Sequence, residues 1–241
     1  MIASLGMYDM PLTAADNDIF WSLIQKNIGT GPNKLDRDTP LWDVWQSPDL
    51  LFAQTCSMPF RTRLTGKVTL IGTPDYALPG CPPGHYRSVL IARIDGPIHV
   101  RDLAGASMAY NENMSQSGWA APLLYLAEQG LKPGQMIETG AHAQSVNAVV
   151  DGQAEFAAID ALTWQLLRQS DPGLTAQLKV IDETPPTPAL PYITANHRDA
   201  EPIAKATAQA IKELPAQSRR LLQIRQLVHI SPEIYQALPT P

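Results

Sequence analysis

The chain has few cysteines, no excess of basic charge and no long apolar run, and each shortage excludes a class of protein. Its two cysteines, Cys56 and Cys81, cannot form a disulfide framework and lack the spacing of a zinc site. We expect two buried or half-buried thiols, and the alternative, a single disulfide between them, is possible only in an oxidising compartment. No apolar run approaches the length of a membrane-spanning helix, so none is predicted.

The balance of charge is mildly acidic, with 18 Lys and Arg against 23 Asp and Glu and a net charge of -5. A general nucleic-acid-binding protein would need a basic face, so that class is not expected. The N-terminus passes from Met1 into an apolar strand without the basic and long apolar segments of an export signal. We therefore expect a cytoplasmic protein if Met1 is native, or a periplasmic one if a signal was removed. No nucleophile elbow, metal-ligand triad or phosphate-binding P-loop is found, so we predict no catalytic residue, metal or cofactor.

Short apolar strands alternate with helical patterns along the whole chain. Thr13 is a candidate cap for a helix that ends near Gly29, and apolar residues recur between them at helical spacing. The predicted strands are 2–7, 50–54, 68–72, 86–94, 107–110, 136–139, 155–159, 178–181 and 190–194. Further helices are predicted at 41–46, 118–129, 143–150, 162–168 and from residue 199 onward. This alternation predicts an α/β fold with mostly parallel sheets.

A polar turn lies between the strand predicted at 107–110 and the helix predicted at 118–129. It ends in Ser115, Gln116, Ser117 and Gly118. A helix that begins there offers two hydroxyls and several backbone N–H groups without partners inside the helix. These donors lie at the positive end of the helix dipole, so the turn is a candidate site for an anion. The alternative is that Ser115 or Ser117 serves only as an N-cap.

Other polar side chains follow the ends of predicted strands. Tyr8, Thr55 and Tyr76 follow the first three strands, and His142 and Asp160 follow two later ones. In open α/β sheets the ligand crevice lies outside the carboxyl ends of the strands, so these residues and the polar turn define one predicted site. Structural alternatives stay open: His142 would cap the helix after it, and Asp160 would cap the helix at 162–168.

Three segments carry a family resemblance: AYNENMSQSGWAAP, ETGAHAQSVNAVVDGQAEFAAIDALTW and TPPTPALPYIT. They resemble the second lobe and return crossing of the phosphate, phosphite and phosphonate substrate-binding proteins of ABC importers. In that family a Ser-Thr-Ser-Gly turn holds the phosphonate oxygens, and its counterpart here is Ser115–Gly118. The family's Gly-x-His and its acidic strand end correspond to His142 and Asp160. Tyr76 matches a pocket tyrosine of the first lobe, and Tyr8 matches more loosely.

The resemblance implies an α/β, two-lobed type 2 periplasmic-binding-protein-like fold with a ligand cleft between the lobes. Lobe one would comprise residues 1–94 plus 182–241, and lobe two residues 95–181. The implied function is capture of a small oxyanion-bearing, phosphonate-like ligand for ABC-type uptake, with an ABC permease as partner. Tyr8 and Tyr76 would close over the ligand, while Thr55 would line the site.

Two departures from the family pattern leave a second hypothesis open, namely that the protein is an enzyme of the same fold. Gln116 replaces the compact threonine of the turn with a long amide, which can still donate to an oxyanion. No export signal is visible, and some proteins of this fold are cytoplasmic enzymes of pyrimidine or menaquinone precursor synthesis. In such an enzyme His142 would act as general acid or base.

Overall fold

The computed structural model describes residues 1–241 and divides into two compact units. Unit 1 comprises Met1–His85 and Pro188–Ala237, and unit 2 comprises Tyr86–Thr187 and Leu238–Pro241. The short strands β4 (His85–Tyr86) and β10 (Thr187–Pro188) lie where the chain passes between the units. The predicted boundaries, after residue 94 and before residue 182, therefore fall inside unit 2. The reason is that the strand Ser88–Arg93, which ends at the first boundary, and the strand Leu178–Glu183, which contains the second, both belong to the sheet of unit 2.

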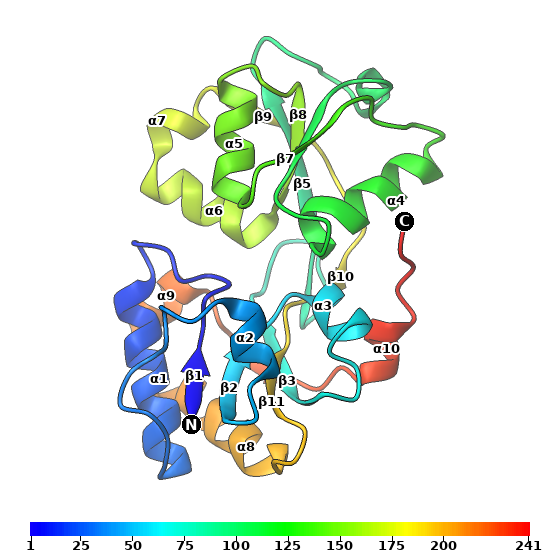
Figure 1. Ribbon diagram of the computed structural model, residues 1–241. Coiled ribbons are helices and arrows are strands. Elements are labelled where there is room, and N and C mark those ends of the chain that lie inside the picture. Colours follow the sequence, from blue (N-terminus) through cyan, green and yellow to red (C-terminus); the bar gives the residue numbers. More distant parts are fainter. The chain divides into compact units, whose positions relative to one another are not determined.

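Unit 1 is built on a five-stranded sheet with the order β1-β2-β11-β3-β12 (Figure 1). Its strands are β1 (Ile2–Ser4), β2 (Leu50–Gln54), β3 (Val68–Asp75), β11 (Tyr192–Ala195) and β12 (Gln226–Val228). β1 and β2 are parallel, whereas β11 runs antiparallel to both β2 and β3. β1, β2 and β3 therefore run in one direction, and their carboxyl ends lie at the same edge of the sheet.

The helices of unit 1 are α1 (Ala14–Ile28), α2 (Leu41–Gln46), α3 (Ser57–Thr62), α8 (Ala200–Glu213), α9 (Ala216–Leu222) and α10 (Pro232–Gln236). α1 begins after Thr13 and ends at Gly29, whose φ of 79° is the left-handed conformation that glycine adopts without strain. Phe20 and Ile24 of α1 and Ile203 and Ile211 of α8 are buried, and the two helices pack together. The apolar residues that recur at helical spacing in α1 and α8 therefore form the interface between the two helices.

Unit 2 has a second five-stranded sheet, with the order β7-β6-β8-β5-β9. Its strands are β5 (Ser88–Arg93), β6 (Met108–Tyr110), β7 (Met136–Glu138), β8 (Phe156–Asp160) and β9 (Leu178–Glu183). β6, β7 and β8 are parallel, while β5 is antiparallel to β8 and β9. Every residue of β8 is buried, as expected for a central strand covered on both faces.

The helical segments of unit 2 are η1 (Val100–Leu103), η2 (Gln116–Ala120), α4 (Ala121–Glu128), α5 (His142–Val150), α6 (Ala161–Ser170) and α7 (Pro172–Thr175). η2 is a π-helical turn that runs directly into α4, so the helix predicted to begin at Gly118 begins two residues earlier. Single π-helical turns are rare in proteins, and those that occur often lie at functional sites.

The structure bears on two expectations, the direction of the strands and the state of the cysteines. The prediction of mostly parallel sheets is wrong: both sheets are mixed, because β11 and β5 each enter antiparallel to their neighbours. Cys56 is buried, Cys81 is half-buried, and no disulfide joins them. No helix is both long and apolar enough to span a membrane.

Candidate functional site

In unit 2 the polar residues predicted as a site follow the carboxyl ends of three parallel strands. The turn Ser115–Gly118 follows β6, His142 begins α5 after β7, and Asp160 ends β8. Since β6, β7 and β8 are parallel neighbours, these ends lie at one edge of the sheet. The sheet topology therefore places the second-lobe candidates at one edge, and their contact with a ligand stays a prediction.

The turn is tied together by Ser115. Its hydroxyl oxygen accepts a hydrogen bond from the Gly118 N–H at 2.9 Å, and its carbonyl accepts one from the Ala120 N–H at 3.0 Å. Ser115 is therefore the N-cap of the helical segment, which is the structural alternative stated above. Gly118 keeps no free N–H for a ligand, whereas the Ser115 hydroxyl still has its own hydrogen to donate.

Ser117 and His142 are predicted site residues from two different strand ends, and the structure brings them into hydrogen-bond contact. Ser117 Oγ lies 3.0 Å from His142 Nε2, although the two residues are 25 positions apart in the chain. Ser88 Oγ donates to the Ser117 carbonyl at 2.7 Å and so fixes the backbone of the turn. The side chain of Ser117 is therefore in contact with an imidazole, while its backbone is anchored to β5.

The imidazole of His142 is a neutral group at physiological pH. Burial lowers the pKa of His142 to about 4, and the ring's Nδ1 is buried without a hydrogen-bond partner. Desolvation disfavours the charged ring, which is the dominant cause. His142 is thus a neutral hydrogen-bonding partner for Ser117, and not the cation that a lone histidine near an anion suggests.

Asn111 was not predicted and lies against the turn. A Cβ atom on Gly118 would lie 1.9 Å from Asn111 Oδ1 and 3.1 Å from His142 Cε1, so only glycine fits there. Asn111 Oδ1 is buried and has no hydrogen-bond partner in the chain. The sequence contained one signal for this contact, the Asn-Glu-Asn run directly after β6, but not the close approach of the amide to Gly118.

Asp160 has a structural role that is visible in the structure. Its Oδ1 accepts hydrogen bonds from the N–H groups of Leu162 at 2.8 Å and Thr163 at 3.0 Å, so it is the N-cap of α6. Capping uses one carboxylate oxygen, and contact between the other oxygen and a ligand stays a prediction.

Gln116, like Ser115 and Ser117, is almost fully buried.

Unit 1 brings two predicted tyrosines together at its own carboxyl edge. The rings of Tyr8 and Tyr76 meet edge to face, with centroids 5.4 Å apart. Gln54, at the end of β2, donates to the Tyr76 hydroxyl at 2.7 Å and orients it. The Tyr8 carbonyl accepts a hydrogen bond from Thr13 Oγ1 at 2.5 Å. Gln54 is a supporting residue that periodicity could not reveal, since it is one more buried residue of a fully buried strand.

Thr55 lies at the same edge but is bound to the backbone. Its hydroxyl donates to the Cys56 carbonyl at 3.3 Å, and its N–H donates to the Pro191 carbonyl at 3.1 Å. These bonds explain a structural role, and ligand contact by Thr55 stays a prediction. No group of three or more His, Cys, Asp or Glu side chains is placed to hold a metal ion.

The fold and these two clusters define the class: an α/β protein of two units, of the kind found in two-lobed periplasmic binding proteins. A family model described as "ABC transporter, phosphonate, periplasmic substrate-binding protein" matches residues 62–230, well over half of the chain. The chain belongs to this family of periplasmic substrate-binding proteins of phosphonate ABC transporters. A search of curated proteins finds no match. The family gives no support to the enzyme alternative.

Solved structures agree in fold at low sequence identity. PhnD1 of Prochlorococcus marinus, in complex with methylphosphonate, has a TM-score of 0.77 at 13% identity over 98% of this chain and 93% of its own. A binding-protein component of an ABC phosphonate transporter from Pseudomonas aeruginosa has a TM-score of 0.67 at 16% identity, covering 92% and 78%. A Xanthomonas citri protein bound to ATP also has a TM-score of 0.67, at 13% identity over 91% and 90%. At such identities these similarities establish the fold alone.

Proposed function

We propose that this chain binds a small oxyanion of the phosphonate class in the periplasm and delivers it to the permease of an ABC importer. The observation that carries the proposal is the 3.0 Å contact between Ser117 Oγ and His142 Nε2, beside the N-terminus of the helical segment 116–128. Family membership supports the role in transport, and the Ser117–His142 pair supports the binding of an oxyanion.

The Ser117–His142 pair suits an oxyanion because of how its hydrogens are arranged. With Nε2 protonated, the imidazole donates to Ser117 Oγ and leaves the hydroxyl hydrogen for a ligand oxygen. The positive end of the helix dipole adds a favourable field for negative charge. The Ser115 hydroxyl, which accepts from Gly118, donates its own hydrogen in the same way.

The ligand class is argued from the donors on the turn. Gln116 places an amide where the family resemblance has a threonine hydroxyl, and amide N–H groups also donate to oxyanions. Methylphosphonate, the ligand of the Prochlorococcus protein, is therefore the first candidate, with phosphite and phosphate as compact alternatives. We propose Tyr8, Tyr76, Thr55 and Asp160 as further contacts, with Asp160 accepting from a ligand amine or hydroxyl.

The test is a titration of purified protein with methylphosphonate, phosphite, phosphate and 2-aminoethylphosphonate by isothermal calorimetry. Binding of one of them, with the ligand recovered unchanged, supports capture without chemistry. Absence of binding to all four, or recovery of an altered compound, refutes the proposal. A matched pair of variants then locates the site: Ser117→Ala should weaken binding, whereas Ser170→Ala, at an exposed serine of α6, should not.

A further inference from the structure

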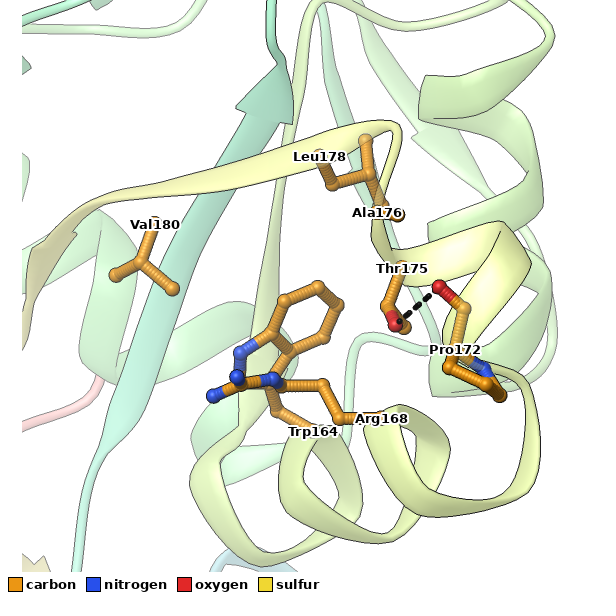
Figure 2. A pocket seen from close by; sticks show the side chains of 7 residues that line it. All are labelled: Trp164, Arg168, Pro172, Thr175, Ala176, Leu178 and Val180. Atoms are coloured by element: carbon orange, nitrogen blue, oxygen red, sulfur yellow. Dashed lines mark hydrogen bonds between the residues drawn. The ribbon is translucent and has the colours of Figure 1, made fainter.

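A hollow of about 400 Å³ lies on unit 2 between α6, α7 and β9 (Figure 2). The residues that line it come from these elements and the turns between them: Trp164, Arg168, Pro172, Thr175, Ala176, Leu178 and Val180. Trp164 and Arg168 are four residues apart, so they lie on one face of α6. None of the residues assigned to oxyanion binding above lines this hollow, so it is a separate feature of unit 2.

Trp164 is the only buried tryptophan whose indole N–H has no acceptor in the chain. Trp21 Nε1 donates to the Pro32 carbonyl at 2.9 Å, and Trp45 Nε1 donates to the Gln54 carbonyl at 3.0 Å. Trp164 is only 6% exposed, yet its Nε1 makes no hydrogen bond. A buried indole N–H normally finds a partner, because leaving it unpaired costs free energy. Since Trp164 borders open space at the hollow, an acceptor for its N–H has to come from there.

Arg168 adds a second set of donors to the same hollow. Its side chain is exposed and makes no hydrogen bond or ion pair in the chain, whereas Arg37 and Arg93 are each bound to a carboxylate. Arg168 lies in the last turn of α6, where the helix dipole favours a cation, but the dipole leaves the guanidinium N–H groups without an acceptor. Figure 2 shows the indole of Trp164 and the guanidinium of Arg168 between α6 and β9. Unused donors of two side chains therefore share one hollow.

The charge around the hollow favours an acceptor with a single negative charge. Asp171, beside Pro172 at the rim, is the N-cap of α7, and its Oδ1 accepts from the Leu174 N–H at 2.9 Å. One guanidinium with one carboxylate nearby attracts a dianion little, because Asp171 would repel the second charge. The planar fork of a guanidinium also matches the two oxygens of a carboxylate.

The wall that faces α6 is apolar and comes from β9. Leu178 and Val180 point to the same face of the strand, and Val180 is 42% exposed. Lys179, between them, points to the other face, so it brings no second cation into the hollow. Pro172 and Ala176 add further apolar surface. A ligand that fills the hollow must therefore carry hydrocarbon next to its anionic group.

We propose that this hollow is a second anion site, which binds a small organic carboxylate with a short hydrocarbon body. The carboxylate oxygens accept hydrogen bonds from the guanidinium of Arg168 and the indole N–H of Trp164, and the hydrocarbon covers Val180. The inference does not depend on which oxyanion binds at the turn Ser115–Gly118.

The experiment follows the indole N–H signals of isotope-labelled protein by NMR while sodium hexanoate is added. The signal of Trp164 is the one missing from the spectrum of Trp164→Phe, which keeps a buried aromatic ring. We expect this signal to move in a saturable way, because a carboxylate oxygen accepts from the indole N–H. Hexanamide, which has the same hydrocarbon chain but no charge, should leave the signal in place. A Trp164 signal that does not move, moves without saturation or moves equally with hexanamide overturns the inference.

Calorimetry measures what the guanidinium and the apolar wall contribute. Arg168→Gln should weaken hexanoate binding about tenfold, whereas Arg220→Gln, at an exposed arginine of α9, should leave it unchanged. Hexanoate should bind about tenfold more tightly than acetate, because the hollow removes part of its longer hydrocarbon chain from water. Equal hexanoate binding by wild type and Arg168→Gln, or equal binding of acetate and hexanoate, overturns the inference.

Methylphosphonate keeps this site apart from the proposed oxyanion site. The Trp164 signal should respond to hexanoate equally with and without saturating methylphosphonate. A hexanoate response that is lost in Ser117→Ala and kept in Arg168→Gln would place the carboxylate at the turn Ser115–Gly118 and overturn the inference. Oxyanion binding without a hexanoate response refutes the second site alone, and a hexanoate response without oxyanion binding refutes the proposed ligand alone.

Discussion

Ser117 Oγ and His142 Nε2 lie 3.0 Å apart, and this contact joins the turn after β6 to the first residue of α5. It makes the hydroxyl of Ser117 a fixed group with a known neighbour, whereas an isolated serine at a helix start would rotate freely.

Replacing Ser117 with alanine should weaken binding of methylphosphonate by about 1–2 kcal/mol, the worth of one hydrogen bond to a charged group. Folding should change little, because the carbonyl that anchors the turn to Ser88 remains. Calorimetric titration of the variant gives the affinity, and its thermal unfolding gives the stability. Equal affinity for wild type and variant would remove Ser117 from the site.

His142 should make the protein sensitive to mild acid. Its folded-state pKa of about 4 lies below the ordinary histidine value of 6.5, so the unfolded chain takes up the proton first. Its contribution to stability is therefore complete above pH 6.5 and is lost as the pH falls toward 4, by up to about 3 kcal/mol. Urea unfolding at several pH values measures this loss.

The matched variants for the pH prediction are His142→Gln and His197→Gln. The first should flatten the fall in stability between pH 6.5 and 4, while the second, at an exposed histidine, should follow the wild type. A wild-type slope that survives in His142→Gln would show that carboxylates, and not this imidazole, set the acid response.

Gly118→Ala should damage the turn, because the added Cβ would lie 1.9 Å from Asn111 Oδ1. Relieving such overpacking costs about 1–3 kcal/mol, measurable as a fall in unfolding free energy. The double variant Asn111→Gly with Gly118→Ala should recover part of the loss, since the clashing amide is gone. Gly173→Ala is the control, with its nearest neighbouring atom at 3.7 Å. Additive effects of the two substitutions at 111 and 118 would argue against the contact.

Two substitutions of Asp160 distinguish its role as a helix cap from its proposed contact with the ligand. Asp160→Asn keeps an oxygen for the N–H groups of Leu162 and Thr163 and should retain stability, whereas Asp160→Ala should lose about 1 kcal/mol. If the carboxylate also accepts from a ligand amine, Asp160→Asn should bind 2-aminoethylphosphonate less tightly and methylphosphonate equally well. An unchanged ratio of the two affinities would leave Asp160 as a cap only.

Several elements could be predicted from the sequence because their signals are local. The helix predicted between Thr13 and Gly29 has its apolar spacing and its glycine stop within one short segment, and the structure has it at Ala14–Ile28, although the Thr13 side chain makes no capping hydrogen bond. The strand at 50–54 and the helix at 41–46 are likewise confirmed. The same holds for Ser115 and Asp160 as caps, since capping is read from neighbouring residues.

Other features depend on contacts between distant residues, which periodicity does not encode. β11 lies between β2 and β3 and reverses the strand direction, although 116 or more residues of chain separate it from β3. The helix α3 was missed because Ser57–Thr62 contains a proline and no repeat of apolar spacing. The lowered pKa of His142 follows from burial, so the sequence alone gave no reason to expect a neutral ring.

The most direct test of the central claim is a calorimetric titration of the wild-type protein with methylphosphonate at neutral pH, followed by mass spectrometry of the recovered ligand. We predict saturable binding at one site, weakened about tenfold by Ser117→Ala, with the ligand unchanged. No binding to any of the four oxyanions, or a ligand returned in altered form, would contradict the assignment as a phosphonate-class substrate-binding protein.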